Sequence, residues 1–445
     1  MSTPGPPGTG GTPGTGGTPG TPGPADPAAG GLRLAPFRGL RYVPERVGSL
    51  AAVTSPPYDV VVRPDGQRRL ETADPHNVVR LILPDAETAQ DRHRKAARTL
   101  ARWLGDGVLA PDPEPAVYVY EQRDGGHLQR GVIGALRLSP PGDGVVLPHE
   151  DVMPGPVADR AALMRATGAN LEPLLLAYRD GAATARIIAR TAAGEGPDAL
   201  LATTTDDGVR HRLWALTDPA DLAAVDADLA TRQALIADGH HRWATYRQLQ
   251  AAHPPGTPWD FGLVLLVDTA RYPLRVRAIH RVLPLLPVAA ALEAAREVFR
   301  VRRLDGTLDD ALAALGAAAA DGNAFVLAGD GLHLLDRPDP RRIDASLPPD
   351  RPEPWRRLDA TVLHSLLLDR VWALPDSPEH IRYIHDAAAA VALAEELGGT
   401  AVLMHPVDEH VVLDLARQGV MMPRKSTSFG PKPASGLVMR SVELG

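Results

Sequence analysis

Apolar residues recur along the chain with two periods, one helical and one strand-like, and both element types are therefore predicted. Helical spacing predicts helices at residues 86–104, 158–167, 221–230, 287–300, 358–371, 386–397 and 407–418. Apolar runs predict strands at residues 32–34, 60–62, 76–83, 173–178, 209–216, 261–268, 274–283 and 400–404, with hairpins over 117–136 and 324–335. Regular βαβ alternation is missing, so we expect an α/β (mixed α+β) fold built on a mixed sheet rather than a Rossmann fold.

The same pattern divides the chain into a tail and three regions. Residues 1–30 are almost wholly Gly, Pro, Thr, Ser and Ala; such a segment cannot bury enough apolar surface to fold, and we expect it to be disordered. The other regions are an N-terminal α/β region (31–205), a central region (206–345) and a C-terminal α/β region (346–445).

Composition narrows the classes of function. The chain has 445 residues, 44% hydrophobic and 23% charged, as is typical of a soluble globular protein. A net charge of −7 argues against a general nucleic-acid binder, and the absence of Cys excludes disulfides, thiolate metal sites and Cys nucleophiles. No apolar run approaches the roughly 20 residues of a membrane span and no signal peptide is recognisable, so we expect a cytoplasmic protein without a membrane partner. The oligomeric state is left open.

The first candidate site lies at the centre of the chain. An apolar run ending at Ala237 predicts a strand, Asp238 and Gly239 predict a tight turn, and a helical pattern begins near His241. Free N–H groups at a helix N-terminus suit an anion, and the donors of His240, His241 and Arg242 add to them. The alternative is an ordinary strand-to-helix turn with solvated side chains.

A second polar stretch carries carboxylates, and a single carboxylate, Asp59, lies nearer the N-terminus. Asp59 follows two prolines that restrict the backbone, and a preorganised carboxylate there suits Mg²⁺ binding or proton transfer. His149, Glu150 and Asp151 lie between a predicted strand and a predicted helix, and Glu150 could serve as a general base or a Mg²⁺ ligand. A structural turn and a solvated acidic turn are the respective alternatives.

The third stretch is a loop near the C-terminus. Lys425, Ser426, Thr427 and Lys432 lie between prolines, which is what a phosphate-binding loop requires, although the Gly-x-x-x-x-Gly of a Walker A motif is missing. A solvated charged face is the alternative. A second His-Arg pair, His280 and Arg281, ends a predicted strand and makes a partly cationic cleft more credible.

Two family resemblances rest on these motifs. The box DGHHRWAT resembles one in the ParB/sulfiredoxin superfamily, which includes serine kinases and CTP-binding proteins. Most of the chain after residue 31 is similar to the bacterial DUF1015 family, through PFRGLRYVPERVGSLAAVTSPPYDV, HEDVMPGPVADRAALMRATGAN, IADGHHRWAT, IHRVL and MPRKSTSFGPKPASGLVM. The first resemblance implies a ParB/sulfiredoxin-like core elaborated by N- and C-terminal α/β segments, and the second implies no particular activity.

We expect the three polar stretches to converge on one cleft, and their inventory fits phosphoryl transfer. The hypothesis is an enzyme that uses Mg²⁺ and ATP or ADP to phosphorylate a small hydroxylated metabolite, such as serine. Glu150 would be the base, with Asp59 and Asp238 as further catalytic carboxylates. Phosphates would bind to Gly239, His240, His241, Arg242, Lys425, Ser426 and Thr427, and substrate to His149, His280, Arg281 and Lys432.

Two other functions remain open. A nucleotide-binding regulator of ParB type would use the same box without an acceptor. A metal-dependent hydrolase would use His149, Glu150, His240, His241 and His280, but no His-x-x-x-His or Glu-x-x-His spacing supports a preformed transition-metal site.

Overall fold

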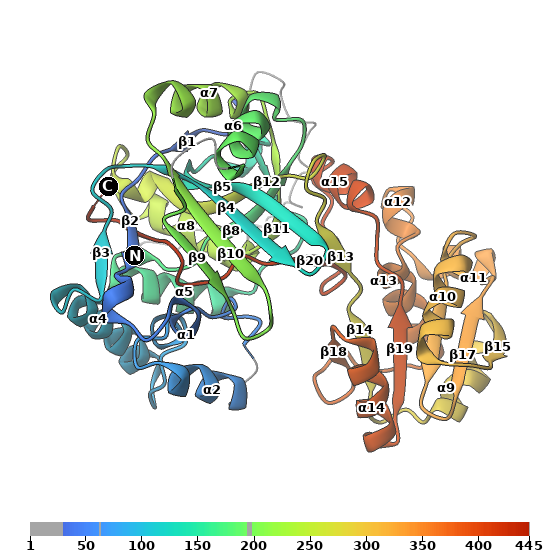
Figure 1. The fold of residues 1–445 in the computed structure, drawn as a ribbon. Helices are drawn as coiled ribbons and strands as arrows, with labels where there is room; N and C mark the ends of the chain where they lie inside the picture. Colours follow the sequence, from blue (N-terminus) through green and yellow to red (C-terminus); the bar gives the residue numbers. More distant parts are fainter. Residues whose placement is uncertain (1–29, 62–63, 194–197, 445) are drawn as a thin grey trace, which may run out of the picture.

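The computed structural model describes residues 30–61, 64–193 and 198–444. Except for Gly30, the tail that we predict to be disordered lies outside these residues. The described chain forms two lobes (Figure 1). The large lobe holds the elements up to β12 and those from α15 onward, and the small lobe holds β14 to β19 with the helices between them.

A nine-stranded sheet is the framework of the large lobe. Its strand order is β6-β11-β8-β12-β5-β4-β10-β9, with β1 added to β5. The pairs β11–β6 and β12–β8 are parallel and the others antiparallel, which confirms the predicted mixed sheet. The strands are β1 (Leu34–Ala35), β4 (Val117–Asp124), β5 (His127–Arg137), β6 (Val146–Leu147), β8 (Leu174–Tyr178), β9 (Leu201–Thr204), β10 (Arg210–Leu216), β11 (Ala234–Asp238) and β12 (Phe261–Asp268).

A four-stranded sheet of the large lobe joins N-terminal strands of the chain to a C-terminal one. Its order is β3-β2-β21-β7, so a C-terminal strand lies between N-terminal ones. The bounds are β2 (Gly39–Tyr42), β3 (Leu109–Pro111), β7 (Ala169–Asn170) and β21 (Met439–Ser441). The helices of this lobe are α1 (Leu50–Val53), α2 (Asp65–Ala73), α3 (Val79–Ile82), α4 (Ala89–Gly105), α5 (Pro154–Thr167), α6 (Ala182–Ala192), α7 (Pro219–Leu229), α8 (His240–Ala251) and α15 (Glu409–Arg417).

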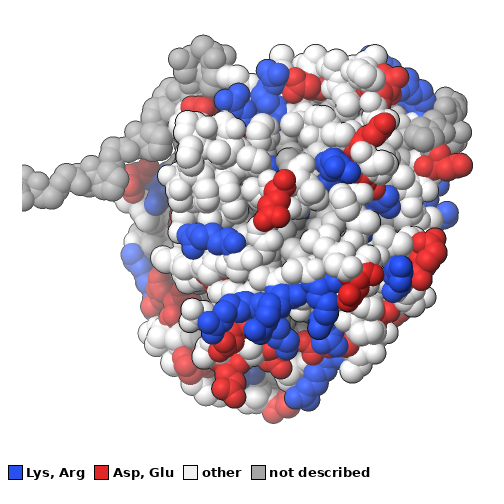
Figure 2. Space-filling model, turned by 90° about the vertical axis from the view of Figure 1, so that its left-hand side faces the viewer, with Lys and Arg blue, Asp and Glu red and all other residues white. Residues whose placement is uncertain are grey.

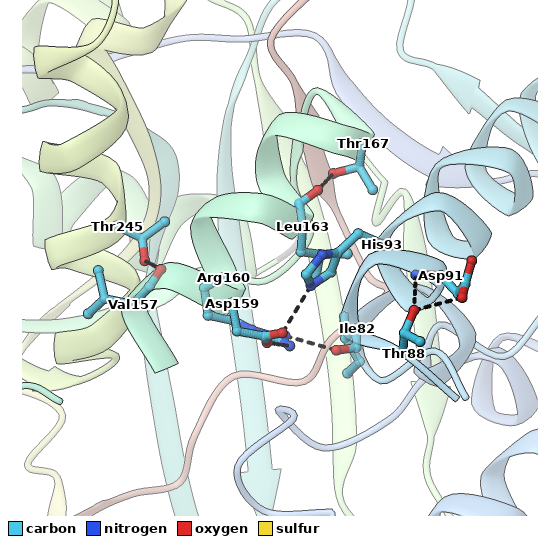
Figure 3. Close-up of polar contacts among 10 residues, drawn as sticks. All are labelled: Ile82, Thr88, Asp91, His93, Val157, Asp159, Arg160, Leu163, Thr167 and Thr245. Atoms are coloured by element: carbon cyan, nitrogen blue, oxygen red, sulfur yellow. Dashed lines mark hydrogen bonds and ion pairs between the residues drawn. The ribbon is translucent and has the colours of Figure 1, made fainter. Parts of the chain in front are cut away.

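Helix α4 shows how the helical pattern predicts an outer layer. Thr88 caps it by accepting a hydrogen bond from the Asp91 amide, and Trp103 is buried on its inner face. Its outer face carries exposed basic residues. In the view of Figure 2, Lys and Arg gather along the lower part of the molecule, with acidic residues among them. Helix α5 lies between α4 and α8, and a hydrogen bond of 2.9 Å between His93 Nε2 and Asp159 Oδ1 holds it to α4 (Figure 3).

The small lobe is a six-stranded sheet with helices packed on it. Its strand order is β15-β17-β16-β19-β14-β18, all antiparallel. The strands are β14 (His280–Leu283), β15 (Arg300–Leu304), β16 (Phe325–Ala328), β17 (Leu332–Asp336), β18 (Arg382–Ile384) and β19 (Thr400–Met404). The helices are α9 (Val288–Ala295), α10 (Leu308–Ala319), α11 (Pro340–Ser346), α12 (Glu353–Arg356), α13 (Asp359–Val362), a π-helix (Leu363–Val371) and α14 (Ala387–Leu397).

A short ladder lies where the chain passes between the lobes. Strand β13 (Arg275–Arg277) pairs antiparallel with β20 (Ser428–Gly430), and Val276 lies opposite Phe429. The outgoing chain is therefore hydrogen-bonded to the C-terminal loop that the sequence singled out as a phosphate-binding loop.

Three predicted strands are wrong. Residues 76–83 contain no strand: Val79–Ile82 form helix α3, and Asn77 Oδ1 accepts a hydrogen bond from the Val79 amide at the start of that helix. Residues 60 and 61 belong to a turn in which the Val60 amide donates to the Pro57 carbonyl. Residues 274–283 are split between β13 and β14, which belong to different sheets.

Most other predicted elements are confirmed, including the hairpin of β4 and β5 and the strands β12 and β19. The predicted helix at 358–371 has inward-facing leucines, as expected, but it continues as a π-helix from Leu363. Within the described part of the chain, no helix combines the length and the apolar character needed to cross a membrane.

Gly131 on β5 provides a test of the central sheet. A Cβ at this position would lie 2.3 Å from the Leu266 carbonyl oxygen on β12, so the backbone has to shift. We expect Gly131→Ala to lower the free energy of unfolding by about 1–3 kcal/mol, measured by urea unfolding. Gly126→Ala, in the turn of the same hairpin and with nothing within 4 Å of its Cβ, is the control and should stay within about 0.5 kcal/mol of the parent. Equal losses in both variants would contradict the packing argument.

Candidate functional site

The ammonium group of Lys432 lies between two carboxylates at the centre of the site. Its Nζ is 2.5 Å from Asp59 Oδ2 and 2.5 Å from Asp238 Oδ1. Asp238 ends strand β11, Asp59 follows the rigid Pro-Pro turn, and Lys432 follows β20. Side chains from positions 59, 238 and 432 thus meet, with 37%, 10% and 21% of their surfaces exposed.

The two carboxyl groups respond differently to this arrangement. Burial acts to raise the pKa of Asp59, but the charges of Lys432 and Arg242 outweigh it and leave that pKa below its usual value. Burial raises the pKa of Asp238, and the neighbouring charge of Asp59 raises it further. Asp59 is therefore the more acidic of the two carboxyl groups and also the more exposed one.

Arg242 binds the carboxylate oxygen of Asp238 that Lys432 does not contact. Its Nη2 donates to Asp238 Oδ2 at 2.7 Å, its Nη1 donates to the Pro173 carbonyl at 2.9 Å, and its side chain is 2% exposed. The sequence predicted a phosphate ligand here. The structure corrects this interpretation, because the guanidinium is buried and its contacts position Asp238.

Helix α8 begins at this point. Its N-cap, Gly239, has φ = 100°, and a Cβ there would lie 2.4 Å from a Leu174 methyl group, so the turn requires glycine. The helix N-terminus directs its first backbone N–H groups out of the turn beside Asp238.

A buried carboxylate behind Asp59 escaped the sequence analysis. Glu172 is 5% exposed, and its Oε1 accepts hydrogen bonds from the Tyr58 amide at 2.9 Å and the Ser435 hydroxyl at 3.1 Å. Burial raises the pKa of Glu172, although Arg242 opposes the shift. Glu172 thereby fixes both the segment that carries Asp59 and the loop that carries Lys432. Nothing in the local pattern around residue 172 indicated this role.

The Tyr58 ring completes this support. The Arg160 guanidinium lies 4.6 Å from its centre, and Arg160 Nη1 also donates to the Ile82 carbonyl at 2.9 Å (Figure 3). Arg160 is therefore buried against Tyr58.

Three histidines line the side of the site next to α8. The His149 amide donates to His240 Nε2 at 3.3 Å, the His149 Nε2 lies 3.0 Å from the Thr427 hydroxyl, and the Met153 amide donates to His241 Nε2 at 3.1 Å. Burial lowers the pKa of His149 to about 4 and that of His240 well below its usual value. Both rings are neutral at pH 7, and His240 and His241 act as acceptors of backbone N–H groups in this structure.

The remaining predicted residues of the loop lie at the rim. The Lys425 amide donates to Glu150 Oε1 at 3.3 Å, and Lys425 itself has φ = 56°. Ser426 is half-buried beside it, and Asp151 is exposed. The structure therefore brings together all three polar stretches, through the contacts of His149 with Thr427, Glu150 with Lys425, and Asp238 with Lys432.

His280 and Arg281 lie in the small lobe instead. Arg281 is fully buried, donates to the Ile279 carbonyl, contacts His364 and lies 4.8 Å from the Tyr383 ring centre, so it is not available to a substrate. His280 lines a separate cavity at the junction of the lobes. Only part of the predicted substrate-binding set therefore reaches the site.

The residues do not fit a preformed Mg²⁺ or transition-metal site. The described part of the chain contains no group of three or more His, Asp or Glu side chains placed to hold one ion. Asp59, one of the two predicted Mg²⁺ ligands, is paired with Lys432, whose ammonium occupies the space between the carboxylates. The proposed metal-dependent hydrolase therefore has no support in this geometry.

The neutral state of His149 has a measurable consequence. The folded pKa of about 4 lies below the unfolded value of 6.5, so the unfolded chain binds more protons between these two values and stability falls as pH falls from 6.5 to 4. Replacing His149 by Gln should reduce the loss of unfolding free energy between pH 7 and pH 4 by about 3 kcal/mol. Urea unfolding at both pH values measures it, and an unchanged pH dependence would contradict burial of the neutral ring.

Several solved structures are similar to this chain at low identity. A free serine kinase variant in complex with AMP has a TM-score of 0.35 and 15% identity over 67% of this chain and 90% of that one. C-terminally truncated SbnI from Staphylococcus aureus has a TM-score of 0.35 and 9% identity over 69% and 86%. A conserved hypothetical protein from Pyrococcus furiosus has a TM-score of 0.33 and 16% identity over 67% and 94%. At these TM-scores the similarity assigns neither fold nor activity to this chain.

No curated protein matches the chain. The family model described as "Protein of unknown function (DUF1015)" matches residues 34–361, about three quarters of the sequence. This match agrees with the resemblance found in the motifs, and the chain belongs to the DUF1015 family.

Proposed function

We propose that this protein is a nucleotide-dependent phosphotransferase that acts on a small hydroxylated metabolite. The observation that carries the proposal is the Lys432 ammonium, held beside the N-terminus of α8 and bonded to the half-exposed carboxylate of Asp59. Phosphoryl transfer needs a fixed cation, backbone donors and a carboxylate near one another, because positioning and charge neutralisation supply most of its catalysis.

The phosphate groups of the nucleotide would bind at the start of α8. The N–H groups in the first turn of α8 lack acceptors within the helix, so they are the donors that the phosphate oxygens would meet. Lys425 stands at the rim of the same site, where its amide bonds Glu150, and supplies a second positive charge. Arg242 acts as a positioning residue, because it holds Asp238 and through it Lys432.

Asp59 is the better of the two candidate bases. It is ionised, exposed and 2.5 Å from Lys432, whereas Glu150 accepts a hydrogen bond from the Lys425 amide at the rim. The acceptor hydroxyl would give its proton to Asp59 while its oxygen attacks the terminal phosphorus. The bond from phosphorus to the bridging oxygen breaks, and the products are the phosphorylated acceptor and the shortened nucleotide.

The first test is nucleotide binding. The melting temperature is measured with ADP, ATP, CTP and GTP, each with and without Mg²⁺. At least one of them should raise it, because a ligand at about 100 times its Kd adds roughly 2.7 kcal/mol to the free energy of unfolding. Lys432→Met removes a charge-assisted contact, and affinity should fall about tenfold or more. Lys95→Met, which changes an exposed lysine of α4, is the control and should bind as the parent does. No shift with any of the four nucleotides would sink the proposal.

The second test separates the candidate bases. Asp59→Asn keeps the shape of the side chain but cannot accept the proton, so acceptor-dependent turnover should fall about 100-fold or more while nucleotide affinity is kept or improves. Glu150→Gln should have a much smaller effect on turnover. Reversed effects would move the base to Glu150. Slow hydrolysis by the parent that no acceptor accelerates would favour a nucleotide-binding regulator instead.

A further inference from the structure

A cavity of about 290 Å³ opens where the chain enters and leaves the small lobe. Its walls come from the segment between β13 and β14, from α10 and from the end of β19, and they are mostly apolar: Val276, Ala278, Leu312, Leu315 and Met404. The volume lies at the lower end of the roughly 300–1,000 Å³ found for small-molecule pockets and corresponds to about ten waters. It fits one flat ring system rather than a free ion.

The polar residues of this cavity are Arg277, His280, His385 and His405, and the first two provide hydrogen-bond donors. His280 is 6% exposed and its Nδ1 accepts a hydrogen bond from the Met404 amide at 3.2 Å, so the proton of the neutral ring is on Nε2. Arg277 adds guanidinium donors at the same wall. Donors on an apolar wall suit a heterocycle that presents ring nitrogens or carbonyl oxygens.

The cavity is connected electrostatically to the phosphotransferase site. His385 lines it, and the charges of Lys432 and Lys425, after burial, are the largest influences that lower the pKa of His385. His385 directly follows strand β18. Val276 and Arg277 of β13 also line the cavity, and they pair with Phe429 and Ser428 of the C-terminal loop. Strand β18 lies on the side of the small lobe that faces the large lobe (Figure 1). The loop that carries both lysines therefore borders the cavity at β20, and its Lys432 contacts Asp238 just before α8.

We propose that this cavity binds the base of the nucleotide, with the phosphate chain running past Lys425 and Lys432 to α8. The inference rests on the proposed function and adds the position of the base. The order of the groups matches a nucleotide: a mostly apolar slot for a ring, then cations, then the backbone donors of a helix. A small acceptor that is polar all round would leave its hydroxyl groups without partners against these apolar walls.

The test compares a ligand that has a base with one that has none. Isothermal titration calorimetry with pyrophosphate, ADP, GDP, CDP and UDP is applied to the parent, Leu312→Trp and Leu308→Trp. Leu312 and Leu308 are both half-buried on α10, but only Leu312 lines the cavity. Filling the cavity should weaken the preferred nucleoside diphosphate about tenfold or more and change pyrophosphate affinity less than about twofold. Leu308→Trp should leave both affinities unchanged.

Each other outcome has a distinct meaning. If Leu312→Trp binds the nucleoside diphosphate as tightly as the parent does, the inference is overturned and the phosphate site remains. The same conclusion follows if the parent binds pyrophosphate as tightly as every nucleoside diphosphate. A parent that binds none of the five ligands overturns the proposed function and this inference with it. Ala278→Leu fills the cavity from another wall and provides the same comparison if Leu312→Trp does not fold.

Discussion

The site depends on one lysine that neutralises two carboxylates. Without Lys432, Asp59 and Asp238 would face each other across a partly buried space, and like charges in such a place cannot both remain ionised at little cost. With it, Asp238 is bonded from one side by Lys432 and from the other by Arg242. The turn after β11 is thereby fixed, and so is the start of α8.

The fold brings these groups together because hydrogen bonds hold the C-terminal loop at several points. The Gln129 side chain donates to the Pro431 carbonyl at 3.1 Å, the Ala434 amide donates to the Tyr120 hydroxyl at 3.4 Å, and Ser435 donates to Glu172. Gln129 and Tyr120 belong to the hairpin of β4 and β5 in the middle of the large sheet. The lysine is therefore anchored to the most buried part of the protein, although it lies in a loop.

The sequence predicted the elements whose periodicity was long and clear, such as α4, β12 and β19, and it identified the three polar stretches that meet. It could not predict which atoms of those stretches pair. Lys432 was assigned to substrate and Arg242 to phosphate, because a sequence shows residue types and not burial. Residues 76–83 were misread because the apolar run is short, and a short run does not distinguish a strand from a helical turn. Glu172 was missed because its partners are more than 100 residues away along the chain.

The ladder of β13 and β20 is a backbone link between the two lobes, beside the hydrogen bond from Trp355 Nε1 to the Met421 carbonyl. Strand β13 is the last segment before the small lobe, and β20 lies between Thr427 and Lys432 in the loop that carries both lysines. A rotation of the small lobe would therefore move the lysine loop as well, because Val276 of β13 is paired with Phe429 of β20. The small lobe is therefore not a free accessory, because the strand that leads into it is paired with the strand next to Lys432.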